Sequence, residues 1–453
     1  MAKLWQKDYQ LNEFIERFTV GRDYILDLRL VTSDCVASLA HAQMLAGIGL
    51  LSAEELESLR AGLTRIIGES AKRTFVIREE DEDCHTAIEN RLTADCGEAG
   101  KKIHTGRSRN DQVIAALRIY ARARLLDIMG ALLDLASALA EFAEKHQSTP
   151  MAGRTHMQTA MPSSVGLWAA SFAELLLDDY ALLDQAFALN NRSPLGSAAS
   201  YGVPLPLDRE LVARLLGFAG IQNNVLAVNN SRGKLESVIL DALDQVGLTL
   251  SKLAQDLIIF SMPEFGYFRI PDELCSGSSI MPQKRNPDGL ELLRSHSSVI
   301  SAAATQIKSI IRSLPSGYNR DFQDTKEPFL RGLALAEECL HVGRLTVEKL
   351  AVDEKRLKAG FTADIFATDA ALDEVEKGAS FREAYRSVAV RLDELGRRDP
   401  AASIETRTSS GTAGNLRLES VYGEISARRH GLAATRRGVE EALAALVGDS
   451  VPI

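Results

Sequence analysis

The sequence predicts an all-α protein whose core is a bundle of long helices. Leu and Ala are frequent, whereas aromatic residues make up only 6% of the 453 residues, and this composition favours helix over sheet. Apolar residues recur at alternating steps of three and four through 125–142 and 239–260. This spacing places one apolar stripe along each helix and favours neighbours packed nearly parallel. Strand signals are sparse, and no GxGxxG, P-loop or GxSxG motif occurs.

The chain divides into three zones, which we interpret as domains. Residues 1–107 mix short helical patterns with polar loops, 108–356 carry the long helical patterns, and 357–453 return to shorter ones. We therefore expect a long-helix core flanked by two smaller, mainly helical domains. Helix breakers separate the long segments at Ser148-Thr149-Pro150, Asn191 to Pro206, Met262-Pro263 and Leu314-Pro315.

Charge and cysteine content restrict the cellular setting. The formal net charge of −9 argues against nucleic acid and anionic membranes as partners. Five scattered cysteines without a CxxC pair favour free thiols in a reducing compartment and predict no metal site. The polar start MAKLWQKDYQ does not read as a signal peptide, and no apolar run is long enough to span a membrane. We expect a soluble, cytoplasmic protein that acts on a small molecule.

Four polar clusters lie close to the predicted ends of the long helices. They occupy residues 102–112, 153–162, 277–288 and 315–327. The third combines Gly277 and serine hydroxyls with a proline, a lysine and an amide just before a helix. A mobile loop, a weak base and positive charge at one place suit the removal of a proton from carbon beside a carboxylate.

These clusters resemble the fumarase/aspartase superfamily of fumarate-releasing lyases. The run GSSIMPQKRNPD at 277–288 resembles the superfamily signature, and Gln283 and Asp288 are most similar to its argininosuccinate lyase version. HTGRSRND at 104–111 is similar to the block of that family that contacts substrate. The resemblance implies a homotetramer in which each active site combines three chains. It also implies reversible β-elimination of argininosuccinate to L-arginine and fumarate, in arginine biosynthesis, through an aci-carboxylate intermediate and without cofactor or metal.

The same resemblance assigns the catalytic roles. Ser278 is the expected base, and His156, oriented by Glu291, is the expected acid, although the reverse assignment of these two stays open. Lys284 and Asn286 are expected to hold the substrate carboxylates and stabilise the extra negative charge. Ser278 requires nearby cations and backbone dipoles, because an ordinary hydroxyl is a poor base at neutral pH.

Further positions are expected to bind substrate. Ser108, Arg109 and Asn110 match residues that bind the succinyl carboxylates, and Thr155 precedes the catalytic histidine. The remaining expected contacts, mostly around the amino-acid end of the substrate, are Asp23, Asp27, Arg232, Tyr318, Gln323 and Lys326. Asp23 departs from the family pattern, because a serine is usual there. His85, with Thr86 and Glu89, resembles a further family segment, H-T-x-x-E.

Two alternatives remain at the level of sequence. One is another lyase of the superfamily, such as adenylosuccinate lyase, whose substrate carries a purine and a phosphate. The forms QKRNPD and HTGRSRND favour argininosuccinate instead. The other is a non-catalytic structural protein on the same scaffold, as lens crystallins are. The presence of Ser278, His156, Lys284 and Asn286 argues against that second alternative.

Overall fold

A computed structural model describes residues 12–396 and 398–451 of the chain. Residues 1–11, on which the expectation about the polar start depends, lie outside this part. The all-α prediction is confirmed: helices dominate, and the strands within these residues form only three two-stranded ladders. None of the described helices is both long enough and apolar enough to cross a membrane.

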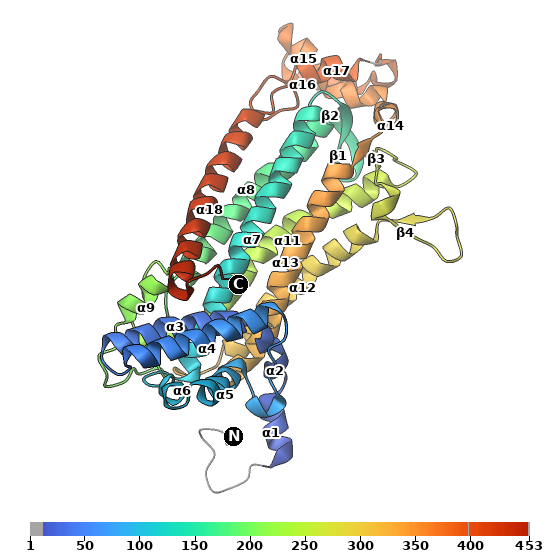
Figure 1. The fold of residues 1–453 in the computed structure, drawn as a ribbon. Helices are drawn as coiled ribbons and strands as arrows, with labels where there is room; N and C mark the ends of the chain where they lie inside the picture. The colour runs from blue at the N-terminus through green and yellow to red at the C-terminus, as the bar shows by residue number, and fades with distance from the viewer. Residues whose placement is uncertain (1–11, 397, 452–453) are drawn as a thin grey trace.

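Five long helices run side by side to form the bundle that the apolar periodicity predicts (Figure 1). Each packs on at least two of the others, and their facing sides form most of one continuous hydrophobic core. The longest has 37 residues and spans about 55 Å at about 1.5 Å per residue. The five are α7 (Arg109–Lys145), α8 (Val165–Asn190), α11 (Lys234–Ser261), α12 (Asp288–Ile311) and α13 (Lys326–Lys349).

Local sequence sets where these helices begin and end. At the start of α7, the Ser108 hydroxyl accepts from the Asn110 backbone N–H while the Asp111 carboxylate accepts from the Ser108 N–H. This capping box satisfies donors that the first turn leaves free. Helices α7, α8, α11 and α12 stop just before the predicted breakers, as expected.

The N-terminal zone covers one end of the bundle with shorter helices (Figure 1). The predicted capping box of Ser52 and Glu55 is present at the start of α4. Helix α3 packs on α4, α5 and α7, and α5 also contacts α7, so this zone is joined to the bundle mainly along α7. Its helices are α1 (Glu13–Val20), α2 (Asp23–Leu26), α3 (Val31–Gly47), α4 (Ala53–Ala71), α5 (Cys84–Cys96) and α6 (Glu98–Lys102). Two short helices, α9 (Arg209–Leu215) and α10 (Val225–Asn230), lie in the crossover between α8 and α11.

The strands form small antiparallel pairs beside the bundle. The main one is a hairpin of β1 (Pro150–Thr155) and β2 (Gln158–Ser164), which joins α7 to α8. A second pair, β4 (Ser276–Gly277) and β5 (Arg285–Asn286), closes a loop that projects from the bundle near the start of α12 (Figure 1). The third is β3 (Phe268–Arg269) with β6 (Ala351–Val352).

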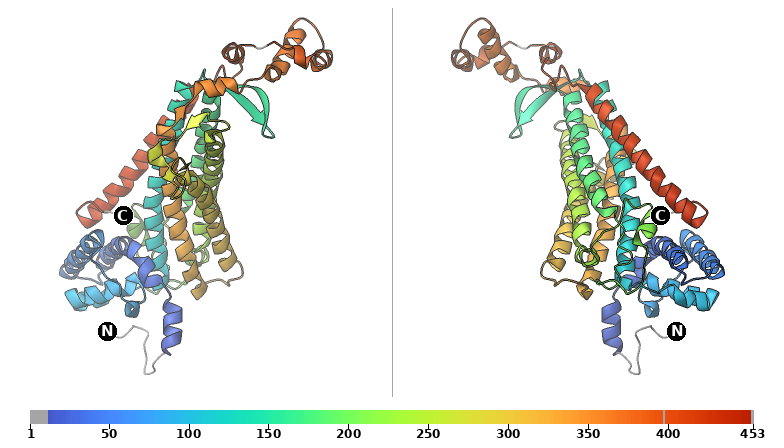
Figure 2. Two further views of the ribbon diagram at one scale, coloured as in Figure 1. Left: turned by 90° about the vertical axis from the view of Figure 1, so that its right-hand side faces the viewer. Right: turned by 90° about the vertical axis from the view of Figure 1, so that its left-hand side faces the viewer.

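The C-terminal zone differs in one respect from the expectation of shorter helices. Its first part fits that expectation, with α14 (Glu354–Ala359), α15 (Ala367–Glu376), α16 (Phe381–Ala389) and α17 (Pro400–Glu405). Figure 2 shows α15–α17 projecting beyond the end of the bundle. The last helix, α18 (Leu418–Val447), has 30 residues and runs back along α7. The short-helix expectation is wrong for α18, because its polar face is wide and its apolar stripe narrow, which weakens the periodic signal.

Candidate active site

A polar cavity lies where the N-terminal helices meet the ends of α7, α11 and α13. Its walls come from segments up to about 300 residues apart in sequence, and seven of the predicted substrate-binding residues take part. The lining residues are Val20, Asp23, Glu82, Asp83, His85, Arg109, Asn110, Val113, Arg232, Tyr318, Arg320, Gln323 and Lys326. Four cations and three carboxylates in one hollow give the site the charges needed to recognise a zwitterionic, multiply carboxylated substrate.

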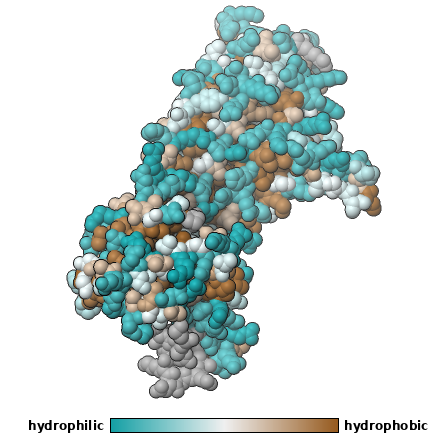
Figure 3. Space-filling view, viewed as in Figure 1, coloured by the Kyte–Doolittle hydropathy of each residue, from teal (hydrophilic) through white to brown (hydrophobic). Residues whose placement is uncertain are grey.

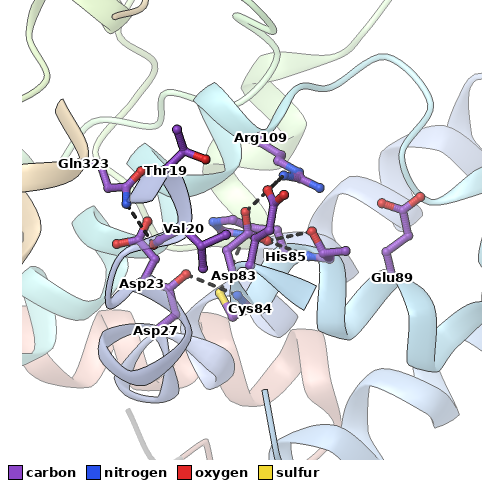
Figure 4. Close-up of polar contacts among 12 residues, drawn as sticks. Thr19, Val20, Asp23, Asp27, Asp83, Cys84, His85, Glu89, Arg109 and Gln323 are labelled. Atoms are coloured by element: carbon purple, nitrogen blue, oxygen red, sulfur yellow. Dashed lines mark hydrogen bonds and ion pairs between the residues drawn. The ribbon is translucent and has the colours of Figure 1, made fainter. Parts of the chain in front are cut away.

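Lys326 is held at this cavity between two carboxylates. Its Nζ lies 2.5 Å from Asp27 Oδ1 and 3.0 Å from Asp23 Oδ2, and Lys326 and Asp27 are 2% and 0% exposed. Burial alone would lower the Lys326 pKa, but the two carboxylates raise it to about 12. Asp27 also accepts from the Cys84 backbone N–H at 3.2 Å, and Figure 4 shows Asp23 and Asp27 next to each other. Asp23 and Asp27, which were expected to contact substrate, therefore form ion pairs with Lys326 within the chain.

Arg109 forms a second cation between two acids. Its Nη1 lies 3.0 Å from Glu82 Oε2 and 3.5 Å from Asp83 Oδ2. Burial would raise the Asp83 pKa, but the charges of His85 and Arg109 and the hydrogen bonds from Thr86 bring it below its usual value. Arg109 is thus fixed in direction at the start of α7, where the backbone N–H groups also favour an anion.

Sequence reasoning missed the acidic side of the cavity. Glu82 and Asp83 were not among the predicted contacts, although the acidic run at 79–83 before a helix start could have indicated them. His85, noted only for its family segment, also lines the cavity, and its Nδ1 lies 3.0 Å from Asp34 Oδ1. Burial disfavours the His85 cation, yet Asp34 and its neighbours raise the His85 pKa above 6.5. Asp34 is distant in sequence and gave no signal.

Arg232 enters the cavity from the turn before α11. Gly233 follows it with φ +76°, and an added Cβ there would lie 2.6 Å from Ile311 Cγ2, so the turn requires glycine. The Arg232 guanidinium carbon lies 5.7 Å from the Tyr318 ring centre and 5.5 Å from that of Phe322. Gln323 is held in the same wall, since its Nε2 donates to the Val20 carbonyl at 3.0 Å.

His156 lies elsewhere, at the tip of the β1–β2 hairpin. Thr155 pairs with Gln158, so His156 and Met157 are the two turn residues, with φ of +52° and +63°. A two-residue hairpin needs this left-handed geometry, but non-glycine residues adopt it at a cost of about 1–2 kcal/mol each. Thr155, His156 and Met157 are all exposed. The backbone of this turn is therefore strained, and it places His156 at the surface of the chain.

Ser278 lies in the exposed loop between β4 and β5. Its Oγ accepts from the backbone N–H groups of Ile280 and Met281, at 3.4 and 3.1 Å. Ile280 is 83% exposed, and the tip of this projecting loop is hydrophobic in Figure 3. Lys284 is exposed as well, whereas the Asn286 side chain donates back to Ser276 Oγ across the loop base at 3.4 Å. Two backbone N–H groups therefore already donate to the Ser278 hydroxyl, which the resemblance implies is the base.

One chain therefore separates the predicted residues into two groups. Asp23, Asp27, Arg109, Asn110, Arg232, Tyr318, Gln323 and Lys326 gather at the cavity, with Ser108 capping the adjacent helix. A second group lies towards the opposite end of the bundle, on the hairpin, the loop and the start of α12 (Figure 1): Thr155, His156, Ser278, Lys284, Asn286 and Glu291. His156 and Glu291 lie on different exposed segments, and the described residues of one chain show no contact between them.

The described residues hold one group with metal-ligand chemistry, formed by Asp27, Cys84 and His85. Their donor atoms lie within 4.8 Å of one another and all three residues are buried. The Lys326 ammonium lies 2.5 Å from Asp27, however, and burial raises the pKa of the Cys84 thiol well above 9.0. A protonated thiol and an adjacent ammonium do not suit a cation. We assign this group to the ion-pair network of the cavity.

Comparison with known proteins identifies the relatives of this arrangement. A family model described as Lyase matches residues 11–301. Argininosuccinate lyase of Sorangium cellulosum is 46% identical over 421 residues, which cover 92% of this chain and 97% of that protein. Argininosuccinate lyase of Thermotoga neapolitana is 41% identical over 85% of this chain and 97% of its own length. That of Phocaeicola vulgatus is 42% identical, covering 93% and 95%.

Solved structures share the fold. A crystal structure of EDDS lyase in complex with formate superposes with a TM-score of 0.81 at 22% identity, covering 97% of this chain and 96% of that one. A class II fumarase from Schistosoma mansoni gives a TM-score of 0.70 at 16% identity, covering 85% and 94%. At these identities the likeness concerns the fold, and it confirms the fumarase/aspartase-like architecture expected from sequence.

Proposed function

The chain belongs to the argininosuccinate lyase family, and on this premise we propose that it cleaves argininosuccinate into L-arginine and fumarate in arginine biosynthesis. The observation that carries the proposal is the polar cavity, which gathers the matching residues Arg109, Asn110, Tyr318, Gln323 and Lys326 at one place. Its charges complement a substrate with three carboxylates, an ammonium and a guanidinium. The chemistry is a reversible β-elimination with an aci-carboxylate intermediate.

The proposed mechanism begins with proton removal by Ser278. The proton comes from the carbon beside a succinyl carboxylate, and the charge that develops there is stabilised by Lys284, Asn286 and backbone N–H groups. The C–N bond then breaks, and His156 delivers a proton to the departing guanidino nitrogen, with Glu291 fixing its orientation. The substrate carboxylate itself accepts the electron pair, so the residues of this chain suffice. The exchange of roles between Ser278 and His156 remains the alternative.

The division of these residues into two groups supports a site shared between subunits of a homotetramer. Leu175, Leu182 and Leu189 lie seven residues apart on α8 and are exposed in the single chain, as are Leu248 on α11 and Leu292 on α12. Such a stripe calls for partner helices. If bundles associate with opposite directions, the hairpin and loop of neighbouring chains reach the cavity of a third.

We also propose the cytoplasm as the location and three domains as the organisation. The five cysteines are free thiols and three of them are buried, which suits a reducing compartment. The proposed boundaries remain 1–107, 108–356 and 357–453. Within the last domain, α18 packs along the bundle, α15 and α16 share a small core of their own, and α17 packs on the β1–β2 hairpin.

Fumarate release tests this function directly. Purified protein is given argininosuccinate or adenylosuccinate, and fumarate is followed by ultraviolet absorbance. We expect turnover of argininosuccinate and none of adenylosuccinate. Turnover of adenylosuccinate alone would contradict the assignment in favour of the second lyase, and turnover equal to buffer with both would favour a structural protein.

A further inference from the structure

We propose that Arg232 is the residue that binds the α-carboxylate at the amino-acid end of the substrate, and that it thereby selects amino acids over amines. This inference rests on the proposed function and assigns a specific role within it. It follows from a difference between the cations of the cavity, of which Arg232 alone has neither an ion pair nor a side-chain hydrogen bond among the described residues.

Lys326 is poorly placed to bind a substrate carboxylate. It is 2% exposed, and two carboxylates already lie 2.5 and 3.0 Å from its Nζ. The local sum of Lys326, Asp23 and Asp27 is one net negative charge, so this corner attracts an ammonium rather than an anion. Asp23 lines the cavity and is the member of the trio that a substrate ammonium can reach.

The other two cations are also engaged. Arg109 lies between Glu82 and Asp83, at 3.0 and 3.5 Å. Arg320 donates through Nη2 to the Thr19 carbonyl at 2.5 Å, which holds the Arg320 side chain against α1. Each of these groups has a partner within the protein that already satisfies part of its charge or its hydrogen bonding.

Arg232 is different. It is 5% exposed and lines the cavity, yet no described carboxylate lies within ion-pair distance of it, and its Nε has no hydrogen-bond partner in the described part of the chain. Its neighbours are the rings of Tyr318 and Phe322. Burial lowers the Arg232 pKa, although Tyr318, Glu236, Asp23 and Asp27 attract the guanidinium without forming an ion pair with it. A buried cation without a direct ionic partner is under-satisfied, and a carboxylate ligand supplies that partner.

The position of Arg232 identifies which carboxylate it binds. Tyr318, Gln323 and Lys326, the residues that family resemblance places around the amino-acid end, line the same wall. An α-amino acid presents its ammonium and carboxylate on one carbon. Asp23 and Arg232 offer opposite charges within the same cavity, so together they match this zwitterion, and removal of the carboxylate leaves Arg232 unpaired.

The reverse reaction tests the inference. Fumarate consumption is measured with L-arginine and with agmatine, which is arginine without its α-carboxylate. Wild-type protein should favour arginine in kcat/KM by about tenfold or more, the usual contribution of a charged hydrogen bond. Arg232→Met should lower this preference by about the same factor, mainly because KM for arginine rises. The kcat/KM for the addition of agmatine to fumarate should change little. Arg232→Gln is the second variant, should Arg232→Met unfold, and the same fall in preference is expected.

Arg320→Met is the matched control, because Arg320 lines the same cavity but is held by the Thr19 carbonyl. An equal loss of preference in Arg320→Met and Arg232→Met would overturn the inference, as would an unchanged preference in both Arg232 variants. Equal losses with arginine and agmatine would assign Arg232 to the succinyl end, against the inference. Failure of wild-type protein to consume fumarate with arginine would instead contradict the proposed function.

Discussion

The cavity and the β4–β5 loop are the two regions in which the predicted chemistry lies, and they are built in opposite ways. The cavity is pre-organised by buried ion pairs, with Lys326 held by Asp23 and Asp27. The loop is exposed, and in the described part of the chain Ser278 Oγ accepts hydrogen bonds only from N–H groups of its own turn. The difference shows that the ion pairs of the cavity form within one chain, whereas the proposed proton-transfer groups lie on exposed segments, for which we propose a desolvated environment between chains.

The largest effect is expected at the loop. Ser278→Ala should lower kcat by about 10²–10⁴-fold, the usual contribution of a positioned acid or base. Because Ser278 lies in an exposed loop away from the core, the thermal unfolding temperature should not change, and substrate should still bind. Ser279→Ala is the neighbouring control and should have a small effect. An unchanged kcat in Ser278→Ala would rule out its role as base.

The next effect concerns the stability of the cavity. Lys326→Met should lower the free energy of unfolding by about 3–5 kcal/mol, because it leaves the buried Asp27 without its counter-charge. Lys308→Met is the matched control: Lys308 lies 2.6 Å from Asp241 on the surface, and its loss should cost about 1 kcal/mol or less. Urea unfolding measures both. Equal losses would show that the cavity is no more pre-organised than the surface.

How much of this contrast could be predicted from sequence depends on the range of the interactions. The helices and the breakers are local, and their positions were predicted well at Pro150 and Pro263. Arg109, Tyr318 and Lys326, which line the cavity, could be selected from sequence because they belong to short motifs with recognisable spacing. The pairing of Lys326 with Asp27, and of His85 with Asp34, joins distant segments and leaves no local pattern. The length of α18 was missed because its apolar stripe is narrow.

The exposed leucine stripe of α8 offers a way to separate the chains of the proposed assembly. Leu182→Glu places a charge on the exposed stripe of α8 and should dissociate the assembly, with a loss of activity of at least about tenfold. The molar mass measured by light scattering and the rate of fumarate release should decrease together. Val390→Glu, at an 84% exposed position in the C-terminal zone, should leave both unchanged. A fully active monomer would show that one chain contains a complete site.

The smallest effect is a pH dependence of the cavity. The charges of Asp34, Asp83 and Asp27 overcome burial and raise the His85 pKa above 6.5 in the folded protein. Protonated His85 therefore stabilises the fold fully below about pH 6.5, and this contribution is lost as pH rises through the raised pKa. Thermal unfolding from about pH 6 to about pH 9 should show this decline in wild-type protein and a flatter profile in His85→Gln. Parallel profiles would contradict it.

Mixed assembly tests the central claim most directly. Ser278→Ala has a defective loop and an intact cavity, and Arg109→Ala the reverse, so each alone should be nearly inactive. If loop and cavity of one site come from different chains, co-refolding the two variants should restore about a quarter of the wild-type sites by random association. If one chain supplies both, no site in the mixture is intact, and activity that stays at the level of the separate variants would contradict the account.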